Sequence, residues 1–267
     1  MNIIRIENPD DPRTAAFRDI RERDLTGRQG LFVAEGEVVL RVLASPASRC
    51  RTRAVLLAEN RLTALTDVLA ALPPETPVHV APQPVLDGIA GFHLHRGILA
   101  IGEKPRETGL AEVLEGMPER ALTVLACGIG NHDNMGGVFR NAAAFGADAV
   151  LLDRACCDPF YRKAIRVSVG AVLRTPIAVG LDAMAAVEAL KAAGFAVLAM
   201  TPSADRTLDQ IPPSPRIAVV LGSEGPGLPP ELIARCTPVG IRMSGGFDSL
   251  NVGTAGAIAL HHFARLA

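Results

Sequence analysis

Residues 128–153 read GIGNHDNMGGVFRNAAAFGADAVLLD, and this stretch decides the fold class. The apolar run 122–126 before it predicts a buried strand, and a second strand is expected at 149–152, after Gly146. The helix between the two strands is predicted to begin near Gly136. A strand, a polar glycine-rich turn, a helix and another strand make a βαβ unit, which is typical of α/β proteins with a parallel sheet.

The turn of this unit is a candidate ligand site, because open α/β sheets bind ligands where strands lead into helices. Asn134 is expected in the turn, and Arg140 about one helical turn later, on the side facing back toward it. Apolar or small neighbours such as Phe139 suggest that Arg140 has a function. The alternative is an ordinary solvated arginine.

Two later segments have similar features. Residues 216–232, RIAVVLGSEGPGLPPEL, predict a buried strand followed by a turn that places Glu224 among glycines. Residues 243–263, MSGGFDSLNVGTAGAIALHHF, predict a tight turn and then a helix of small residues, with Ser249 and Asn251 at its start. A capped, buried C-terminal helix is the alternative for the second segment.

Taken in order, the three segments resemble the SpoU (TrmH-like) branch of the SPOUT RNA 2′-O-ribose methyltransferases. The first family motif, N-x-G-x-x-x-R-x-A, is matched from Asn134 to Ala142. The second, G-x-E-G-x-G-L, is matched from Gly222 to Leu228, and the third, S-L-N-V, from Ser249 to Val252. Three matches in the right order are far more specific than any single one.

The resemblance implies an α/β fold whose C-terminal SPOUT domain has a parallel sheet and a deep trefoil knot. The sequence predicts strands at 122–126, 149–152, 175–179, 196–200, 217–221 and 238–242. General connection rules would join them into an unknotted doubly wound sheet, and the resemblance overrides this expectation. The motif at residues 30–43 is similar to the small substrate-binding domain, related to ribosomal protein L30e, that many SpoU enzymes carry. The expected domains are therefore 1–104, L30e-like and RNA-binding, and 120–267, methyltransferase, with a linker at 105–119.

The resemblance also implies S-adenosylmethionine as the cofactor and RNA (rRNA or tRNA) as the substrate. The expected catalytic residues are Arg140, Glu224, Ser249, Asn251 and Asn134. The expected cofactor-binding residues are Met200, Thr201, Gly222, Ile241 and Leu250, with Ile241 and Leu250 on either side of the adenine. The family further implies a homodimer, and neither a metal ion nor a membrane is required.

Composition is compatible with this interpretation. The chain of 267 residues is 49% hydrophobic, and no apolar run or N-terminal segment is typical of a membrane span or a secretory signal. Five cysteines without a C-x-x-C pair indicate neither a disulfide framework nor a zinc site. We therefore expect a cytoplasmic protein. The pair His93 and His95 could bind a metal, but a lone H-x-H is more often structural.

Charge gives the main argument against a nucleic-acid partner, since the formal net charge is −1. The basic residues are nonetheless clustered, and arginine suits phosphate because its planar fork contacts two oxygens. One cluster contains Arg13, Arg18, Arg21, Arg23 and Arg28. Arg162 and Arg166 share a predicted helix face and are candidate RNA contacts, the alternative being an ordinary solvated helix face. One tyrosine and no tryptophan argue against a stacking platform for single strands.

Two other functions remain open at this stage. The first is a catalytically silent RNA-binding protein that uses the same fold, which the intact set of Arg140, Glu224, Ser249 and Asn251 disfavours. The second is a dinucleotide-dependent enzyme, which the missing G-x-G-x-x-G order disfavours.

Overall fold

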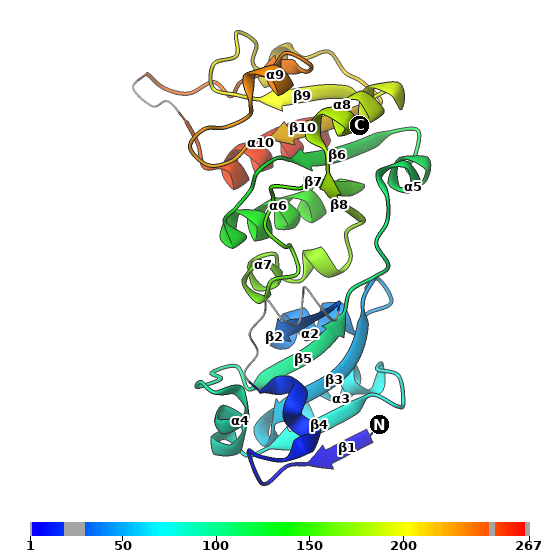
Figure 1. Ribbon diagram of the computed structural model, residues 1–267, viewed down its shortest axis with the longest axis vertical. Coiled ribbons are helices and arrows are strands. Elements are labelled where there is room, and N and C mark those ends of the chain that lie inside the picture. Colours follow the sequence, from blue (N-terminus) through cyan, green and yellow to red (C-terminus); the bar gives the residue numbers. More distant parts are fainter. Residues whose placement is uncertain (1, 19–29, 246–248, 265–267) are drawn as a thin grey trace. The chain divides into compact units, whose positions relative to one another are not determined.

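The computed structural model describes residues 2–18, 30–245 and 249–264. The chain forms two compact units, which are described separately (Figure 1). The first comprises Met1–Pro105 and Asp158–Arg174, and the second comprises Arg106–Cys157 and Thr175–Ala267. No helix within the described residues has the length and apolar character needed to cross a membrane.

The first unit is built on a mixed five-stranded sheet with the order β1-β4-β3-β5-β2. β1, β4 and β3 are parallel, whereas β5 runs antiparallel to both β3 and β2. Its strands are β1 (Asn2–Arg5), β2 (Leu31–Glu35), β3 (Arg51–Ala58), β4 (Pro77–Ala81) and β5 (Ile98–Glu103). Its helices are η1 (Pro12–Phe17), α2 (Glu37–Leu43), η2 (Glu59–Arg61), η3 (Thr63–Leu65), α3 (Thr66–Ala70), α4 (Gln83–Ala90), α7 (Arg162–Val167) and η4 (Ala171–Leu173).

Residues 158–174 belong to the first unit although they interrupt the second in sequence. The backbone N–H of Arg49 donates to the carbonyl of Leu173 at 2.8 Å, and Lys104 Nζ contacts Asp158 Oδ2 at 2.8 Å. This differs from the sequence-based division, which assigned the segment to 120–267. The predicted helix face with Arg162 and Arg166 therefore lies on α7, in the first unit.

A buried histidine lies beneath η1. His79 in β4 is 3% exposed, and its ring meets Phe17 edge-on with centroids 5.9 Å apart. Its Nδ1 atom has no hydrogen-bond partner among the described residues. Burial lowers the pKa of His79 below 6.5, and the positive charge of Arg13 lowers it further. A backbone hydrogen bond with Val55 and the negative charge of Asp11 oppose this shift. The folded state thus favours the neutral ring.

We expect acid to destabilise the first unit through His79. As the pH falls, the histidine of the unfolded chain is protonated near pH 6.5, whereas that of the folded chain is protonated only at a lower pH. The contribution of the neutral ring to the free energy of unfolding is therefore fully present above pH 6.5 and is lost as the pH falls below it. Urea unfolding of the protein and of His79→Gln at pH 7.5, 6.5 and 5.5 measures this. The stability advantage of the unmodified protein should shrink by up to about 1.4 kcal/mol per pH unit below 6.5. A pH-independent difference would contradict the prediction.

The second unit is built on a six-stranded sheet with the order β11-β9-β10-β6-β7-β8, and every neighbouring pair is parallel. The parallel α/β class predicted from the sequence is therefore confirmed. The strands are β6 (Ala121–Ala126), β7 (Ala149–Asp153), β8 (Ile177–Leu181), β9 (Ala196–Met200), β10 (Arg216–Leu221) and β11 (Thr237–Val239). The helices are α5 (Leu110–Glu115), α6 (His132–Ala144), α8 (Ala183–Ala192), η5 (Leu208–Gln210), α9 (Pro230–Ile233) and α10 (Val252–Ala264).

Helices cover both faces of this sheet, which explains why its central strands are almost continuously apolar. On one face, side chains of α5, α8 and α9 form a core with alternate residues of β6, β7, β9 and β10. On the other face, α10 packs against α6 and β10. Gly256 makes this contact close, because a Cβ atom there would lie 2.9 Å from Leu221 Cδ1.

The start of α6 corrects one sequence-based expectation. The helix begins at His132 rather than near Gly136, because the Asn131 side chain accepts a hydrogen bond from the Asp133 N–H and caps the helix. Asn134 therefore lies in the first turn of the helix and not in the loop. Arg140 is correspondingly about two turns into α6 instead of one.

Candidate functional site

A cleft of about 430 Å³ opens in the second unit at the carboxyl ends of β9, β10 and β11. These three strands are adjacent and parallel, so the loops that follow them meet at one edge of the sheet. The cleft is lined by Met200, Thr201, Pro202, Leu221, Gly222, Ser223, Glu224, Gly225, Gly227, Ile241, Met243, Ser249, Leu250, Asn251, Val252 and Ala255. A crevice at this edge is the usual ligand position in open α/β sheets.

The loop after β10 is a tight turn that only glycine allows at its first position. A Cβ atom on Gly222 would lie 2.5 Å from both the Gly227 carbonyl carbon and the Leu228 nitrogen. The turn is closed by a hydrogen bond from Gly227 N–H to the Ser223 carbonyl at 3.2 Å. Gly225 and Gly227 have φ angles of +87° and +72°, which L side chains rarely adopt. Backbone therefore forms much of this wall of the cleft.

A chain of polar contacts joins the three sequence motifs. Asn134 Nδ2 in α6 donates to Glu224 Oε1, and Asn134 Oδ1 accepts from Asn251 Nδ2 at 2.8 Å. One carboxamide thus binds a carboxylate with its donor end and a second carboxamide with its acceptor end. The contact is made because β10 lies beside β6, which brings the loops after these strands together.

Asn251 also caps the C-terminal helix. Its Oδ1 atom accepts hydrogen bonds from the N–H groups of Gly253 and Thr254 at 2.9 and 3.3 Å. These bonds satisfy two N–H groups that a helix start leaves without an intrahelical partner. Asn141 Nδ2 in α6 donates to the Gly253 carbonyl at 2.8 Å, so the first turn of α10 is held to α6 at two points.

Most of the sequence-predicted residues meet in this cleft. Its lining includes all five proposed cofactor contacts, Met200, Thr201, Gly222, Ile241 and Leu250. It also includes the proposed catalytic residues Glu224, Ser249 and Asn251, while Asn134 lies beside it through its hydrogen bonds.

Val252, a motif match, and Ala255, a small residue expected to let a ligand approach, also line the cleft, although neither was proposed as a cofactor contact. Their spacing of three residues places them on one face of the helix. Sequence reasoning missed Pro202 and Met243, which have no comparable signal.

Arg140 is not among the residues that line the cleft. Arg140 is exposed on α6, and its side chain makes no hydrogen bond or ion pair with a described residue. The guanidinium of Arg140 is therefore available to bind a ligand or another molecule.

The predicted RNA-binding arginines, Arg162 and Arg166, belong to the first unit, whereas the cleft belongs to the second. Arg162 in α7 is 3.6 Å from Glu35 Oε2, and its guanidinium lies 5.0 Å from the ring centroid of Phe92. Arg166 is exposed on the same helix.

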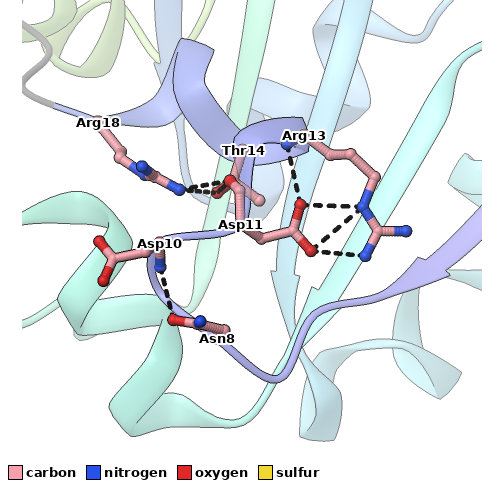
Figure 2. A network of polar contacts seen from close by, with 6 residues as sticks. All are labelled: Asn8, Asp10, Asp11, Arg13, Thr14 and Arg18. Carbon is pink, nitrogen blue, oxygen red and sulfur yellow. Dashed lines mark hydrogen bonds and ion pairs between the residues drawn. The ribbon is translucent and has the colours of Figure 1, made fainter.

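The N-terminal arginine cluster is partly neutralised. Arg13 makes a two-pronged contact with the Asp11 carboxylate, with Nη2 to Oδ2 at 2.5 Å, and this pair holds the pKa of Asp11 at about 2 (Figure 2). Arg18 Nη2 donates to the Asp11 carbonyl and to Thr14 Oγ1 (Figure 2). Arg21, Arg23 and Arg28 lie outside the described residues.

The described ranges show no metal centre, and the thiol of Cys156 is not set up as a nucleophile. They contain no group of three or more His, Cys, Asp or Glu side chains arranged to hold a metal ion. His93 Nδ1 is instead 2.6 Å from Asp87 Oδ2. Burial raises the pKa of the Cys156 thiol to about 12, so this side chain stays protonated at neutral pH.

The sequence profile of the SpoU rRNA Methylase family matches residues 121–261, which contain the whole cleft. An uncharacterized tRNA/rRNA methyltransferase of Mycobacterium bovis is 39% identical over 270 residues, a region covering 97% of this chain and 90% of the relative.

Solved structures share the fold over nearly the entire chain. The crystal structure of an RNA 2′-O ribose methyltransferase is 26% identical, with a TM-score of 0.77 over 98% of this chain and 99% of that one. The SpoU methyltransferase AviRb of Streptomyces viridochromogenes, solved with AdoMet, is 22% identical, with a TM-score of 0.78 over 96% and 98% of the two chains. At that identity the second likeness shows the fold alone.

Proposed function

The chain belongs to the SpoU rRNA Methylase family, and we propose that it transfers a methyl group from S-adenosylmethionine to a ribose 2′-hydroxyl of a structured RNA, either rRNA or tRNA. The observation that carries the proposal is the convergence of three separate motif segments on one cleft at the carboxyl ends of β9, β10 and β11. The likeness to an RNA 2′-O ribose methyltransferase supports the choice of the 2′-hydroxyl.

The cleft fits a cofactor of this kind. Its volume of about 430 Å³ is within the range of small-molecule sites. Ile241 and Leu250 offer apolar surface for the adenine, and the glycine turn after β10 lets a ligand approach backbone N–H and carbonyl groups closely. Thr201 and Ser249 add hydroxyls that can bind polar groups. When bound, S-adenosylmethionine supplies a methyl group on a positively charged sulfur.

The 2′-hydroxyl must lose its proton as it accepts the methyl group, and an alcohol is a poor nucleophile at neutral pH. Arg140 is our candidate for assisting this step, in one of two ways. It can relay the proton together with a substrate phosphate, or it can act as a cation that binds the phosphate and the developing alkoxide. The second role suits the high pKa of guanidinium better.

The contacts among Glu224, Asn134 and Asn251 give these residues a positioning role in the proposal. Asn134 fixes the direction of the Glu224 carboxylate, and Asn251 ties both to the start of α10. Glu224 is exposed at the cleft and can therefore orient the ribose. Ser249 is proposed to complete the polar edge of the same site.

The proposal extends to the organisation of the protein. We propose a trefoil knot in the second unit, an L30e-like RNA-binding role for the first unit, a cytoplasmic location and a homodimer. The dimer would place α6 and α10 at a two-fold axis through the faces that their contact within the chain leaves open, and the exposed Ile258 on α10 supports this placement. Sedimentation at micromolar concentration tests it, and a species of only 28.0 kDa would refute the dimer.

Replacing Gly222 with alanine should weaken cofactor binding. The new Cβ atom would lie 2.5 Å from backbone atoms of Gly227 and Leu228, so the turn must open. Overpacking strain of about 1–3 kcal/mol corresponds to roughly a 5- to 150-fold loss of affinity. Titration calorimetry with S-adenosylmethionine measures it. Gly130→Ala is the control, because Gly130 follows β6 and a Cβ atom there would meet no atom within 4 Å. Equal affinities in the two variants would refute this role of the turn.

The proposed reaction is tested by incubating the purified protein with methyl-labelled S-adenosylmethionine and total RNA from cells that lack the gene. Digestion to nucleosides and mass spectrometry then locate the label. Label on the ribose of one nucleotide supports the proposal, and label on a base refutes it. A protein that binds RNA without transferring label is the catalytically silent alternative. Parallel calorimetry with NAD separates a dinucleotide enzyme from both.

A further inference from the structure

The loop between α4 and β5, residues 91–97 of the first unit, is held firmly at its base. Gly91 N–H donates to the Asp87 carbonyl at 2.9 Å, and Gly97 N–H donates to the Leu94 carbonyl at 2.9 Å. Leu94 is buried, and its N–H donates to Asp87 Oδ1 at 3.0 Å. The side chains between these anchors, Phe92, His93, His95 and Arg96, are all exposed.

Planar groups gather on this loop. Phe92 is 40% exposed and is the only aromatic among the large hydrophobic residues that the described chain leaves exposed. The Arg162 guanidinium lies 5.0 Å from its ring centroid. His93 and His95 meet edge to face with centroids 4.3 Å apart. Aromatic rings and guanidinium planes are the surfaces on which unpaired RNA bases stack.

The charge around the loop favours an anion. The Arg96 side chain lies against the backbone of Gly36, where a Cβ atom would be 2.9 Å from Arg96 Nη1. Arg61 lies against the same end of the loop, with its Cγ 3.5 Å from the Cβ position of Gly97. The side chains of three arginines, Arg61, Arg96 and Arg162, therefore contact or adjoin the loop. Two carboxylates lie beside them, because Glu35 contacts Arg162 and Asp87 contacts His93.

We propose that Phe92, His93, His95, Arg96 and Arg162, here called the Phe92 cluster, bind an unpaired nucleotide of the RNA substrate. The base stacks on the pair formed by Phe92 and Arg162, and Arg96 binds the adjacent phosphate. The proposal rests on RNA being the substrate. It assigns to the first unit a specificity-determining contact outside the cleft, and it revises the expectation, drawn from tyrosine and tryptophan counts, that the chain has no stacking platform.

The test uses the full-length protein and two fluorescein-labelled probes, a seven-nucleotide oligouridylate and a blunt RNA duplex of 16 base pairs, with binding followed by anisotropy. Phe92→Ala should weaken oligouridylate binding about 5- to 100-fold, because base stacking is lost. Phe92→Trp should restore it, and duplex binding should be unchanged. Since Phe92 carries no charge, its loss should leave the salt dependence of binding unaltered.

Arg96→Ala should reduce the slope of log affinity against log salt concentration by about 0.7, the value for one lost phosphate contact on a single strand. Arg51→Ala is the matched control, because Arg51 is exposed at the opposite end of β3 and should contribute nothing. Oligouridylate binding that is absent in the unmodified protein, or equal in Phe92→Ala, overturns the inference. Duplex binding that falls in parallel with oligouridylate binding also overturns it.

The same variants separate this inference from the proposed reaction. If the unmodified protein fails to bind S-adenosylmethionine or to methylate RNA, the reaction is refuted whatever the anisotropy shows. If it methylates RNA and Phe92→Ala keeps the KM for RNA, only the Phe92 cluster is refuted. Support requires a raised KM for RNA with unchanged affinity for S-adenosylmethionine.

Discussion

Arg140→Ala is expected to lower methyl transfer by about 10²–10³-fold, the usual cost of losing one transition-state contact. Arg140 is exposed, has no partner among the described residues and does not line the cleft. Its removal should therefore leave both the fold and the affinity for S-adenosylmethionine unchanged. Single-turnover methylation of RNA and calorimetry on the same protein sample measure the two quantities.

Arg140→Lys is the decisive companion variant. Lysine keeps the positive charge but presents it as a point, so it cannot contact two oxygens in a plane as guanidinium does. It should lose most of the activity. Methylation by Arg140→Lys at nearly the unmodified rate would show that Arg140 is neither a proton relay nor an oxyanion clamp.

Leu250→Asp should reduce the affinity for S-adenosylmethionine by more than about 100-fold, because desolvating an unpaired carboxylate costs several kcal/mol. Leu250 lines the cleft and is 40% exposed, so it contributes little to any core. The variant should therefore fold normally, which circular dichroism and thermal unfolding can establish before calorimetry.

Leu250→Met provides the control for this substitution. Methionine has a similar volume and polarity, and such exchanges are usually tolerated. Its affinity should stay close to that of the unmodified protein. If Leu250→Asp bound the cofactor as tightly as Leu250→Met, adenine would not lie against this side chain.

The parallel sheet of the second unit could be predicted because its strands are short apolar runs between turn residues. The first unit was harder to predict. β1 (Asn2–Arg5) is an edge strand of four residues, and it is recognisable only through pairing with β4, about 75 positions away. α4 (Gln83–Ala90) has a proline in its first turn, which suggests a connection unless the helix start is recognised.

The helix start at His132 shows how a local cap, Asn131, and tertiary packing together override the low helix propensity of glycine. Gly136 and Gly137 weaken a helix interior by about 1 kcal/mol each relative to alanine, so they suggested a boundary. In the structure Gly136 is buried and α6 packs against α10, a contact that no local pattern encodes.

The members of the site could be named from the resemblance, but their connections could not. The contact between Asn134 and Glu224 depends on β10 lying beside β6, and these strands are far apart in sequence. The family motif likewise gives no sign that Arg140 lies outside the cleft lining.

Because Asn134 contacts Glu224 and Asn251, the site can form only after the later residues have been synthesised. During synthesis Asn134 leaves the ribosome first, and Asn251 follows more than a hundred residues later. A nascent chain that stops near residue 240 contains β6 to β11 but neither Leu250 nor α10, so one wall of the cleft is missing. The cleft is complete only after the first turn of α10, which carries Val252 and Ala255, has been released.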